Sequence, residues 1–365
     1  MKYRPSPGFA CDLSGQPAAD RVSFGGLSRR DAMRAAFGAV GLGMPSIVRA
    51  QAKDIPFSLD FRIYGGNSPF FLAEENGINK DLGFSVKLDG APGSGESIAR
   101  VASGSHAFGF ADATTLVEFA ARNPSEAPKL ILSIFDRFPA CILSFGKKPI
   151  KTLNDLEGTK IGIGAASAAT KVLPALLERA GADPKKVDWT TVDVKIRDSL
   201  LLRGAIDGVI GFDYTSIFNL IDAGASLDDL HLLYFSDYGF SFPSNGLIAS
   251  RAMIEKEPDL CKRVALSSAR AWKASVKDPA ATIAAVVKRE ALLQTKVEIA
   301  RLEWVLNKHV LTENTRTHGM SYIDPARMTA GMEIIKQGFG LSATPSLDQY
   351  YDARFQPDAS ELKLV

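Results

Sequence analysis

The sequence is poor in cysteine and histidine and has no excess of charge of either sign. Its 365 residues include 3 Cys and 4 His, and the formal net charge is +2. Cys11, Cys141 and Cys261 form no CxxC pair and no Cys/His cluster, so neither a zinc site nor a disulfide framework is indicated. Scattered charges exclude the basic face that nucleic-acid binding requires. We expect no metal, no cofactor and no nucleic-acid partner, and leave open whether Cys141 and Cys261 are free.

The chain also lacks a plausible permanent membrane anchor near its N-terminus. The apolar run from Ala35 to Val48 is shorter than the ~20 residues of a membrane span. It follows Arg29-Arg30 and precedes Ala50-Gln51-Ala52, a small-x-small cleavage site, which is the order of a secretory signal peptide. The arginine pair resembles a twin-arginine export signal, although Ala32 replaces its usual bulky residue. We therefore predict a signal peptide over residues 1–52 and a periplasmic location, the alternative being an amphipathic helix with a chance arginine pair.

The rest of the chain has the composition and pattern of two α/β domains. With 46% hydrophobic residues it can bury a sizeable core, and its length suits two domains. Short alternating or apolar runs such as 57–63 and 208–212 alternate with segments of helical period, which indicates mostly parallel sheets flanked by helices. After residue 246 the pattern is nearly all helical. We place one lobe at 53–146 plus 246–365 and the other at 147–245, so that two crossings form a hinge.

Four stretches of the sequence match motifs of a known family. They are Asn67-Ser68-Pro69-Phe70-Phe71-Leu72-Ala73 with Gly77, Ser103 to Asp112, Lys151 to Gly158 with Ile161-Gly162, and Asp237-Tyr238-Gly239 with Asn245 to Ser250. Together they resemble the exported substrate-binding proteins of ABC importers for thiamine pyrimidine precursors, taurine, sulfonates and nitrate. The last of these stretches is most similar to the pyrimidine-binding branch. The resemblance implies a two-lobed periplasmic-binding-protein fold of type II that closes on a ligand like a clamshell. It also implies a membrane permease as partner and a monomeric receptor.

The candidate ligand site lies at the turns that follow the predicted strands. In open α/β sheets, ligands bind beyond the carboxyl ends of the strands, where helix N-termini present free N–H groups. Gly93 to Ser97 and Gly164 to Ala168 are such turns, one in each lobe; the alternative is that they serve only as tight turns and helix caps. The candidate ligand-binding residues are Tyr64, Asn67, Ser94, Gly95, Glu96, Asp112, Phe138, Ala166, Ser167, Phe212, Tyr214, Asp237, Tyr238 and Asn245.

The chemistry of these positions indicates a planar ligand that carries N–H donors. Aromatic rings near strand ends would stack on a heteroaromatic ring, Tyr64 and Tyr238 being the best candidates. Asp112 and Asp237 supply acceptors, whereas no Arg or Lys falls among the same positions. The alternative role for Asp112 is the N-cap of a helix. We therefore expect a thiamine-precursor-like ligand first, an aromatic acid second, and a sulfonate, taurine or nitrate third.

Two alternatives belong to other functional classes. Pyrimidine synthases of thiamine biosynthesis share the fold, but their cysteine-rich motif has no counterpart here. The histidines lie apart, without catalytic partners at readable spacing, so we expect no enzyme. A sensor module would need a fused output domain, and none is visible, although presentation to a separate sensor remains open.

Overall fold

The computed structural model describes residues 54–146, 148–164 and 167–365. The predicted signal peptide and the candidate site residue Ala166 lie outside these ranges. The described residues belong to one compact unit. None of the helices found in them combines the length and apolar character that crossing a membrane requires.

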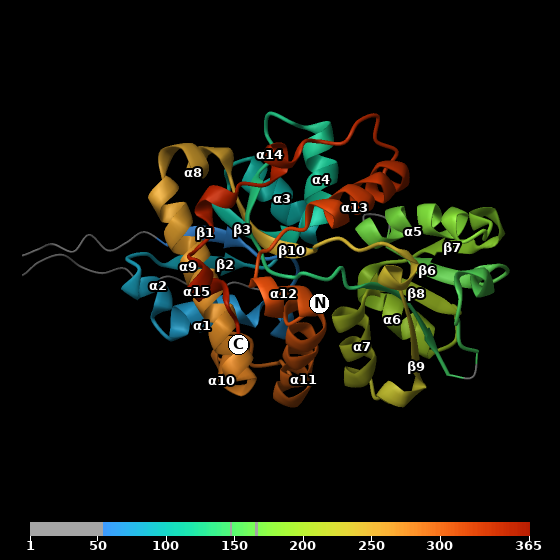
Figure 1. The fold of residues 1–365 in the computed structure, drawn as a ribbon. Coiled ribbons are helices and arrows are strands. Elements are labelled where there is room, and N and C mark those ends of the chain that lie inside the picture. The colour runs from blue at the N-terminus through green and yellow to red at the C-terminus, as the bar shows by residue number, and fades with distance from the viewer. Residues whose placement is uncertain (1–53, 147, 165–166) are drawn as a thin grey trace, which may run out of the picture. The chain divides into compact units, whose positions relative to one another are not determined.

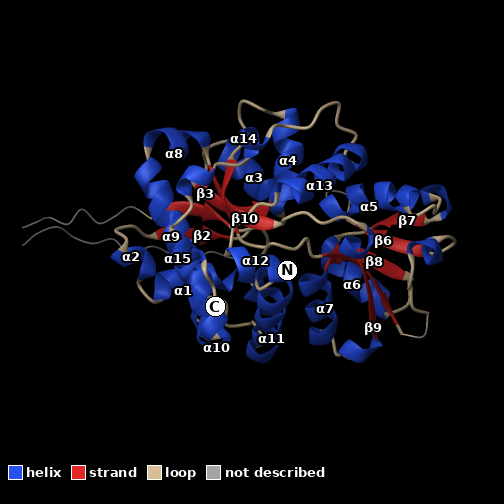
Figure 2. Ribbon diagram, viewed as in Figure 1, coloured by secondary structure: helices blue, strands red, loops and turns tan. Residues whose placement is uncertain are grey.

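The first sheet has five strands in the order β2-β1-β3-β10-β4 (Figures 1 and 2). β1 pairs in parallel with β2 and β3, whereas β10 runs antiparallel between β3 and β4. The central strands β3 and β10 are buried along their whole length, as expected for a sheet covered on both faces. The strands are β1 (Ile55–Ser58), β2 (Val86–Asp89), β3 (Phe108–Asp112), β4 (Lys129–Ser133) and β10 (Asn245–Ala249).

The second sheet repeats this topology in the order β7-β6-β8-β5-β9. β6 pairs in parallel with β7 and β8, and β5 runs antiparallel between β8 and β9. The antiparallel strand of each sheet, β5 or β10, is therefore the first strand after a crossing from the other sheet. The strands are β5 (Ala140–Phe145), β6 (Lys160–Ile163), β7 (Asp188–Thr191), β8 (Gly208–Phe212) and β9 (Leu230–Tyr234).

Helices connect the parallel strands and cover both sheets (Figure 2). The first sheet carries α1 (Ser68–Glu75), α2 (Ile78–Asp81), α3 (Ser94–Ala102) and α4 (Ala113–Arg122), and the second carries α5 (Ala168–Arg179), α6 (Val194–Leu202) and α7 (Asp213–Asp222). The chain after β10 forms α8 (Arg251–Lys256), α9 (Pro258–Lys277), α10 (Pro279–Val287), α11 (Thr295–Val305), α12 (Glu313–His318), α13 (Pro325–Gly338), α14 (Leu347–Tyr350) and α15 (Ala359–Leu362).

The predicted lobe boundaries differ from the sheet pairing at two places. Residues 140–145 fall within the predicted first lobe, yet as β5 they pair with β8 and β9 of the second sheet. α13, also within the predicted first lobe, packs against α5 beside the second sheet. In both cases an apolar segment packs against elements that are distant from it in the sequence: β5 against β8 and β9, and α13 against α5.

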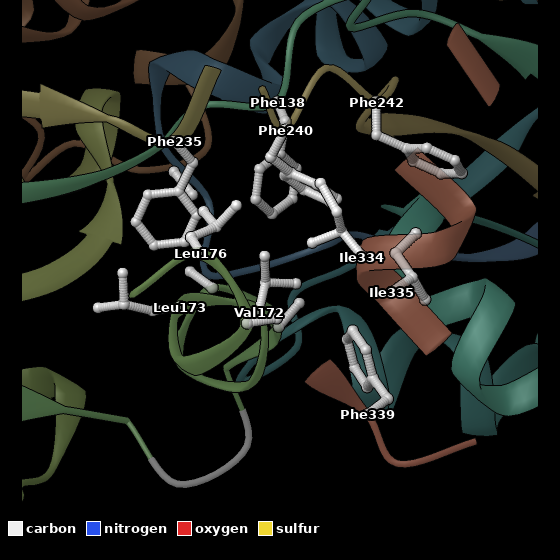
Figure 3. Packing of buried hydrophobic residues seen from close by; sticks show 14 of the residues in the cluster. Phe138, Val172, Leu173, Leu176, Phe235, Phe240, Phe242, Ile334, Ile335 and Phe339 are labelled. Carbon is white, nitrogen blue, oxygen red and sulfur yellow. The ribbon is translucent and has the colours of Figure 1, made fainter. Parts of the chain in front are cut away.

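An apolar cluster joins α5 to α13 and to the two crossing segments (Figure 3). α5 contributes Val172, Leu173 and Leu176, whose spacing places them on one helix face. The ring of Phe138 comes from the first crossing and contacts that of Phe240, from the second, at 4.9 Å between centroids. The other members labelled in Figure 3 are Phe235, Phe242, Ile334, Ile335 and Phe339. The lobes therefore share a core beside the hinge.

Candidate functional site

A cavity of about 420 Å³ lies between the carboxyl ends of the parallel strands of the two sheets. Its wall includes the N-terminal residues of α3, α5, α6 and α7, together with Asp112 and Thr115 at the start of α4. This convergence follows from the right-handed strand-to-helix connections, which bring helix N-termini to the same edge of each sheet. Free N–H groups and the positive ends of the helix dipoles therefore point toward the cavity.

Asp60 lies on the cavity wall just beyond β1 and is held by a buried hydrogen-bond network. Its carboxylate accepts from Nδ2 of Asn67 at 3.2 Å, from the Tyr64 hydroxyl at 3.3 Å and from Nδ2 of Asn245 at 2.8 Å. Burial raises the pKa of Asp60 to about 6, although these hydrogen bonds oppose the shift. Asp60 is therefore an acceptor at neutral pH that takes up a proton under mildly acidic conditions.

A second buried carboxylate, Asp112, lies at the end of β3 and combines two roles. It caps α4 by accepting from the Thr115 N–H at 2.9 Å, and it accepts from the Ser244 hydroxyl at 2.9 Å. Its own N–H donates to the Ser94 hydroxyl at 3.1 Å, which ties the start of α3 to β3. Burial raises the pKa of Asp112 as well. Because Asp112 also lines the cavity, the capping role and ligand contact can coexist.

Four aromatic rings, two from each lobe, line the cavity. The rings of Tyr64 and Tyr214 are nearly parallel, with an interplanar angle of 11° and 6.1 Å between centroids. Phe61 meets Tyr64 edge-on, and Phe212 lies tilted against Tyr214. Burial raises the pKa values of Tyr64 and Tyr214 well above the ordinary tyrosine value, so both hydroxyls are neutral.

The expectation that the site contains no cation is wrong, because Arg197 lines the cavity. Its guanidinium is buried and donates to Asp198 at 3.0 Å, to the Ile210 carbonyl at 2.7 Å and to the Ser216 hydroxyl at 2.6 Å. A Cβ on Gly211 would lie 2.8 Å from both terminal nitrogens of Arg197, so any other residue there would force the buried guanidinium to shift. The neighbouring Asp198 balances most of the charge of Arg197.

Several polar contacts bridge the lobes, among them the hydrogen bonds that Trp304 and His309 make to Asp213. Lys171 of α5 binds both carboxylate oxygens of Glu118 of α4 at 2.8 Å. Arg62, after β1, donates to Oδ1 of Asn219 of α7 at 2.9 Å. Side chains of one lobe therefore contact side chains of the other in this structure.

Most of the predicted site residues line the cavity. They are Tyr64, Ser94, Gly95, Glu96, Asp112, Ser167, Phe212 and Tyr214. Asn67 and Asn245 do not line it but donate hydrogen bonds to Asp60, which does.

Three other predicted residues lie outside this cavity. Phe138 is 1% exposed because its ring packs against Phe212 and Phe240 in the shared core. Asp237 and Tyr238 belong to a short turn after β9, where Asp237 lies 4.0 Å from Arg137 and Tyr238 packs on the apolar cluster. A position near a strand end in the sequence is therefore not sufficient to predict that a side chain lines the cavity.

The sequence reasoning overlooked several cavity residues, of which Asp60 and Arg197 carry charge. Asp60 lies inside the alternating run 57–63, which predicts a long strand, but β1 ends at Ser58. The feature of the sequence that could have identified Asp60 is a carboxylate placed between apolar residues near the end of a strand. Arg197 lies in the first turn of α6, where a solvated arginine is the ordinary expectation.

The lining side chains do not form an obvious catalytic constellation. Among the described residues that line the cavity there is no Cys, His or Lys. In the described ranges as a whole, no group of three His, Cys, Asp or Glu side chains is arranged to hold a metal ion. The cavity instead offers the buried acceptor carboxylates of Asp60 and Asp112, the exposed carboxylate of Glu96, flat rings and free N–H groups.

Comparison with known proteins adds a family match and several relatives. A family model described as NMT1/THI5 like matches residues 66–282. The riboflavin-binding protein RibY of Chloroflexus aurantiacus is 23% identical over 250 residues, which cover 66% of this chain and 68% of that protein.

Solved structures show the same fold. The periplasmic aliphatic sulphonate binding protein SsuA of Escherichia coli matches with a TM-score of 0.65 at 14% identity, covering 84% of this chain and 94% of that one. SsuA of Xanthomonas axonopodis pv. citri, bound to MOPS, matches with a TM-score of 0.62 at 14% identity, covering 82% and 98%. The predicted two-lobed α/β binding-protein fold is thereby confirmed.

Proposed function

Because the chain belongs to the NMT1/THI5-like family, we propose that it is a solute-binding receptor that captures a small molecule and delivers it to an ABC importer. Its relatives, a riboflavin-binding protein and sulfonate-binding proteins, support this role. The observation that carries the proposal is the interlobe cavity, whose volume of about 420 Å³ lies within the ~300–1,000 Å³ typical of small-molecule sites. Among the described residues that line the cavity, no serine or threonine hydroxyl has a histidine or lysine beside it to act as a general base, so nothing there favours an enzyme.

The proposed ligand is a planar heteroaromatic compound with N–H donors, such as a thiamine pyrimidine precursor. Asp60 and Asp112 can only accept hydrogen bonds when ionised, and an aminopyrimidine offers donors to them. Phe61 and Phe212 provide faces and edges for a flat ring. The isoalloxazine ring of riboflavin has the same planar shape and an N–H donor, so the relative RibY makes a flavin the next ligand to test.

A sulfonate or an aromatic acid is the second candidate, favoured by Arg197 and by the helix N-termini at the cavity. Two features weigh against it. Arg197 is already paired with Asp198, and an anion would face Asp60 and Asp112. We therefore rank anionic ligands behind neutral or cationic heteroaromatic ones.

Export and organisation complete the proposal. We propose that residues 1–52 direct export to the periplasm by the twin-arginine route and that the receptor works as a monomer with a membrane permease. Of the predicted contacts that are not among the cavity residues, we retain Ala166, which precedes the cavity residue Ser167 in the sequence, as a proposed ligand contact.

The test is thermal unfolding of the protein from Lys53 to Val365 with aminopyrimidines, riboflavin, aromatic carboxylates, alkanesulfonates, taurine and nitrate. A ligand at a hundredfold excess over Kd stabilises the folded form by about 2.7 kcal/mol. Each kcal/mol of this stabilisation raises the Tm by roughly 2–4 °C. A shift with aminopyrimidines or riboflavin that disappears in Asp60→Asn supports the ligand class. A shift with sulfonates alone would keep the receptor role and replace the ligand.

A further inference from the structure

α11 lies behind the cavity and contacts both lobes. It packs against the turn Gly65–Asn67 of the first lobe and against α7 of the second, and Figure 1 shows α11 alongside α7. Neither Glu298 nor Arg301 of α11 lines the cavity, yet both are almost fully buried, with 5% and 2% of their surface exposed. Buried charged side chains of this kind need a structural reason.

Glu298 and Arg301 form an ion pair that reaches the backbone of both lobes. Arg301 donates through Nε to Glu298 Oε2 at 2.9 Å and through Nη2 to Oε1 at 3.2 Å. Its Nη1 donates to the Tyr214 carbonyl at 2.7 Å. On the other side, the Gly65 N–H donates to Glu298 Oε2 at 2.5 Å. The pair therefore ties the residue after Tyr64 to Tyr214 itself.

The same guanidinium also contacts the ring of Tyr64. Its central carbon lies 5.5 Å from the centroid of the Tyr64 ring and 5.5 Å from that of Phe218 on α7. The Tyr64 ring also lies close to Gly66, because a Cβ at that position would lie 2.5 Å from a ring carbon. The Tyr64 ring thus lies against Arg301, and the absence of a side chain at Gly66 leaves space for it. Its hydroxyl donates to Asp60 on the cavity wall, whereas Arg301 and Gly66 do not line the cavity.

We propose that the Glu298 and Arg301 pair is a positioning device for the ligand site, which sets the Tyr64 and Tyr214 rings, one from each lobe, in their parallel arrangement. This inference rests on the proposed function, because it assigns these rings to ligand recognition. The pair acts through the two tyrosines and not by contact with the ligand. It makes a segment far along the chain a determinant of affinity for planar ligands.

The test compares variants of the pair with a surface control. Removing one partner leaves a buried charge, so Arg301→Lys is made as the conservative variant, and Glu298→Gln with Arg301→Met as a doubly neutral one that keeps an acceptor for the Gly65 N–H. The control is Arg270→Met with Glu361→Gln, an ion pair at 2.6 Å on the exposed surface. Crystal structures without ligand report the angle between the Tyr64 and Tyr214 rings, and calorimetry reports Kd for the best heteroaromatic ligand and for an alkanesulfonate.

In the doubly neutral variant we expect the rings to lose their parallel arrangement and heteroaromatic affinity to fall roughly tenfold, with a smaller change for the alkanesulfonate. Arg301→Lys should recover only part of the loss, because lysine lacks the planar fork. Unchanged ring geometry in a folded variant would overturn the inference even if no ligand binds. Loss of binding in Tyr64→Ala with normal binding in the pair variants would overturn it while preserving the proposed function. Failure of the unmodified protein to bind any panel ligand would reject the proposed ligand class, and the ring geometry would then decide the inference alone.

Discussion

Asp60 is the cavity residue whose charge responds most directly to pH. Its pKa is raised to about 6 by burial, so the carboxylate is ionised at neutral pH and protonated in mild acid. For a raised carboxyl pKa, the contribution to folding stability is present below the ordinary value of 3.8 and is lost as pH rises through about 6. At neutral pH, where Asp60 is ionised and can accept a hydrogen bond in the cavity, the free energy of unfolding of the free receptor is therefore lower than in mild acid as far as Asp60 contributes to it.

Ligand affinity should accordingly depend on pH through Asp60. A ligand that donates an N–H to this carboxylate should lose affinity below pH 6, by at most about tenfold per pH unit. Calorimetric Kd values across this range provide the measurement. Asp60→Asn should bind more weakly and lose most of this dependence, whereas Asp112→Asn separates the contribution of the second carboxyl, whose pKa is also raised. An unchanged pH profile in Asp60→Asn would contradict the assignment.

Gly211 provides a second test at the level of single residues. Gly211→Ala places a methyl group 2.8 Å from both terminal nitrogens of Arg197, so the buried guanidinium must move away from its partners. Overpacking of this kind costs about 1–3 kcal/mol, which thermal unfolding will detect as a lower Tm. Gly95→Ala is the matched control, because Gly95 also lines the cavity but has no atom within 4 Å of its added Cβ. Equal Tm values for the two variants would refute the steric argument.

The charged cavity residues show what single-sequence reasoning can and cannot find. The sequence predicts Asp112 because it lies in the turn after the strand pattern of residues 106–110, and the structure places it on the cavity wall. Asp60 was overlooked because alternation continues past the true end of β1 at Ser58, so the side chain was assigned to a strand. Arg197 was overlooked because its burial depends on Asp198, Ile210 and Ser216, and only the fold brings the last two close.

At the scale of elements, α13 is the segment whose position is least evident from its own sequence. The apolar faces of α5 and α13 are visible as helical patterns, but nothing in either pattern specifies the other as its partner. Strand positions were more predictable, since Gly208–Phe212 was expected as a strand and is β8. Local patterns thus predict elements, whereas pairing between distant helices depends on shape and on which faces remain uncovered.

The packing of α13 on α5 should contribute measurably to stability. Ile335 is fully buried in the cluster that joins these helices (Figure 3), so Ile335→Ala should cost about 2–5 kcal/mol and lower the Tm. Ile196→Ala removes the same atoms from a side chain that is 50% exposed on α6 and should cost far less. Similar denaturant midpoints for the two variants would mean that the α5 and α13 contact adds little.

At the scale of the whole molecule, the lobes should not unfold independently. α11 packs on α7, and α13 packs on α5, so both C-terminal helices link to the second lobe. Differential scanning calorimetry should therefore show one transition in which calorimetric and van't Hoff enthalpies agree. Two resolved transitions would show instead that the shared core does not couple the lobes. Ile335→Ala is the informative variant here, since a weakened link favours separate transitions.

The late position of α11 and α13 in the chain also bears on synthesis. α5 and α7 leave the ribosome well before Thr295–Val305 and Pro325–Gly338, which later cover them. During that interval the apolar face of α5, with Val172, Leu173 and Leu176, has no partner from α13. During synthesis this apolar face therefore stays uncovered by α13 until translation has passed Gly338, and native packing of α5 must wait until then.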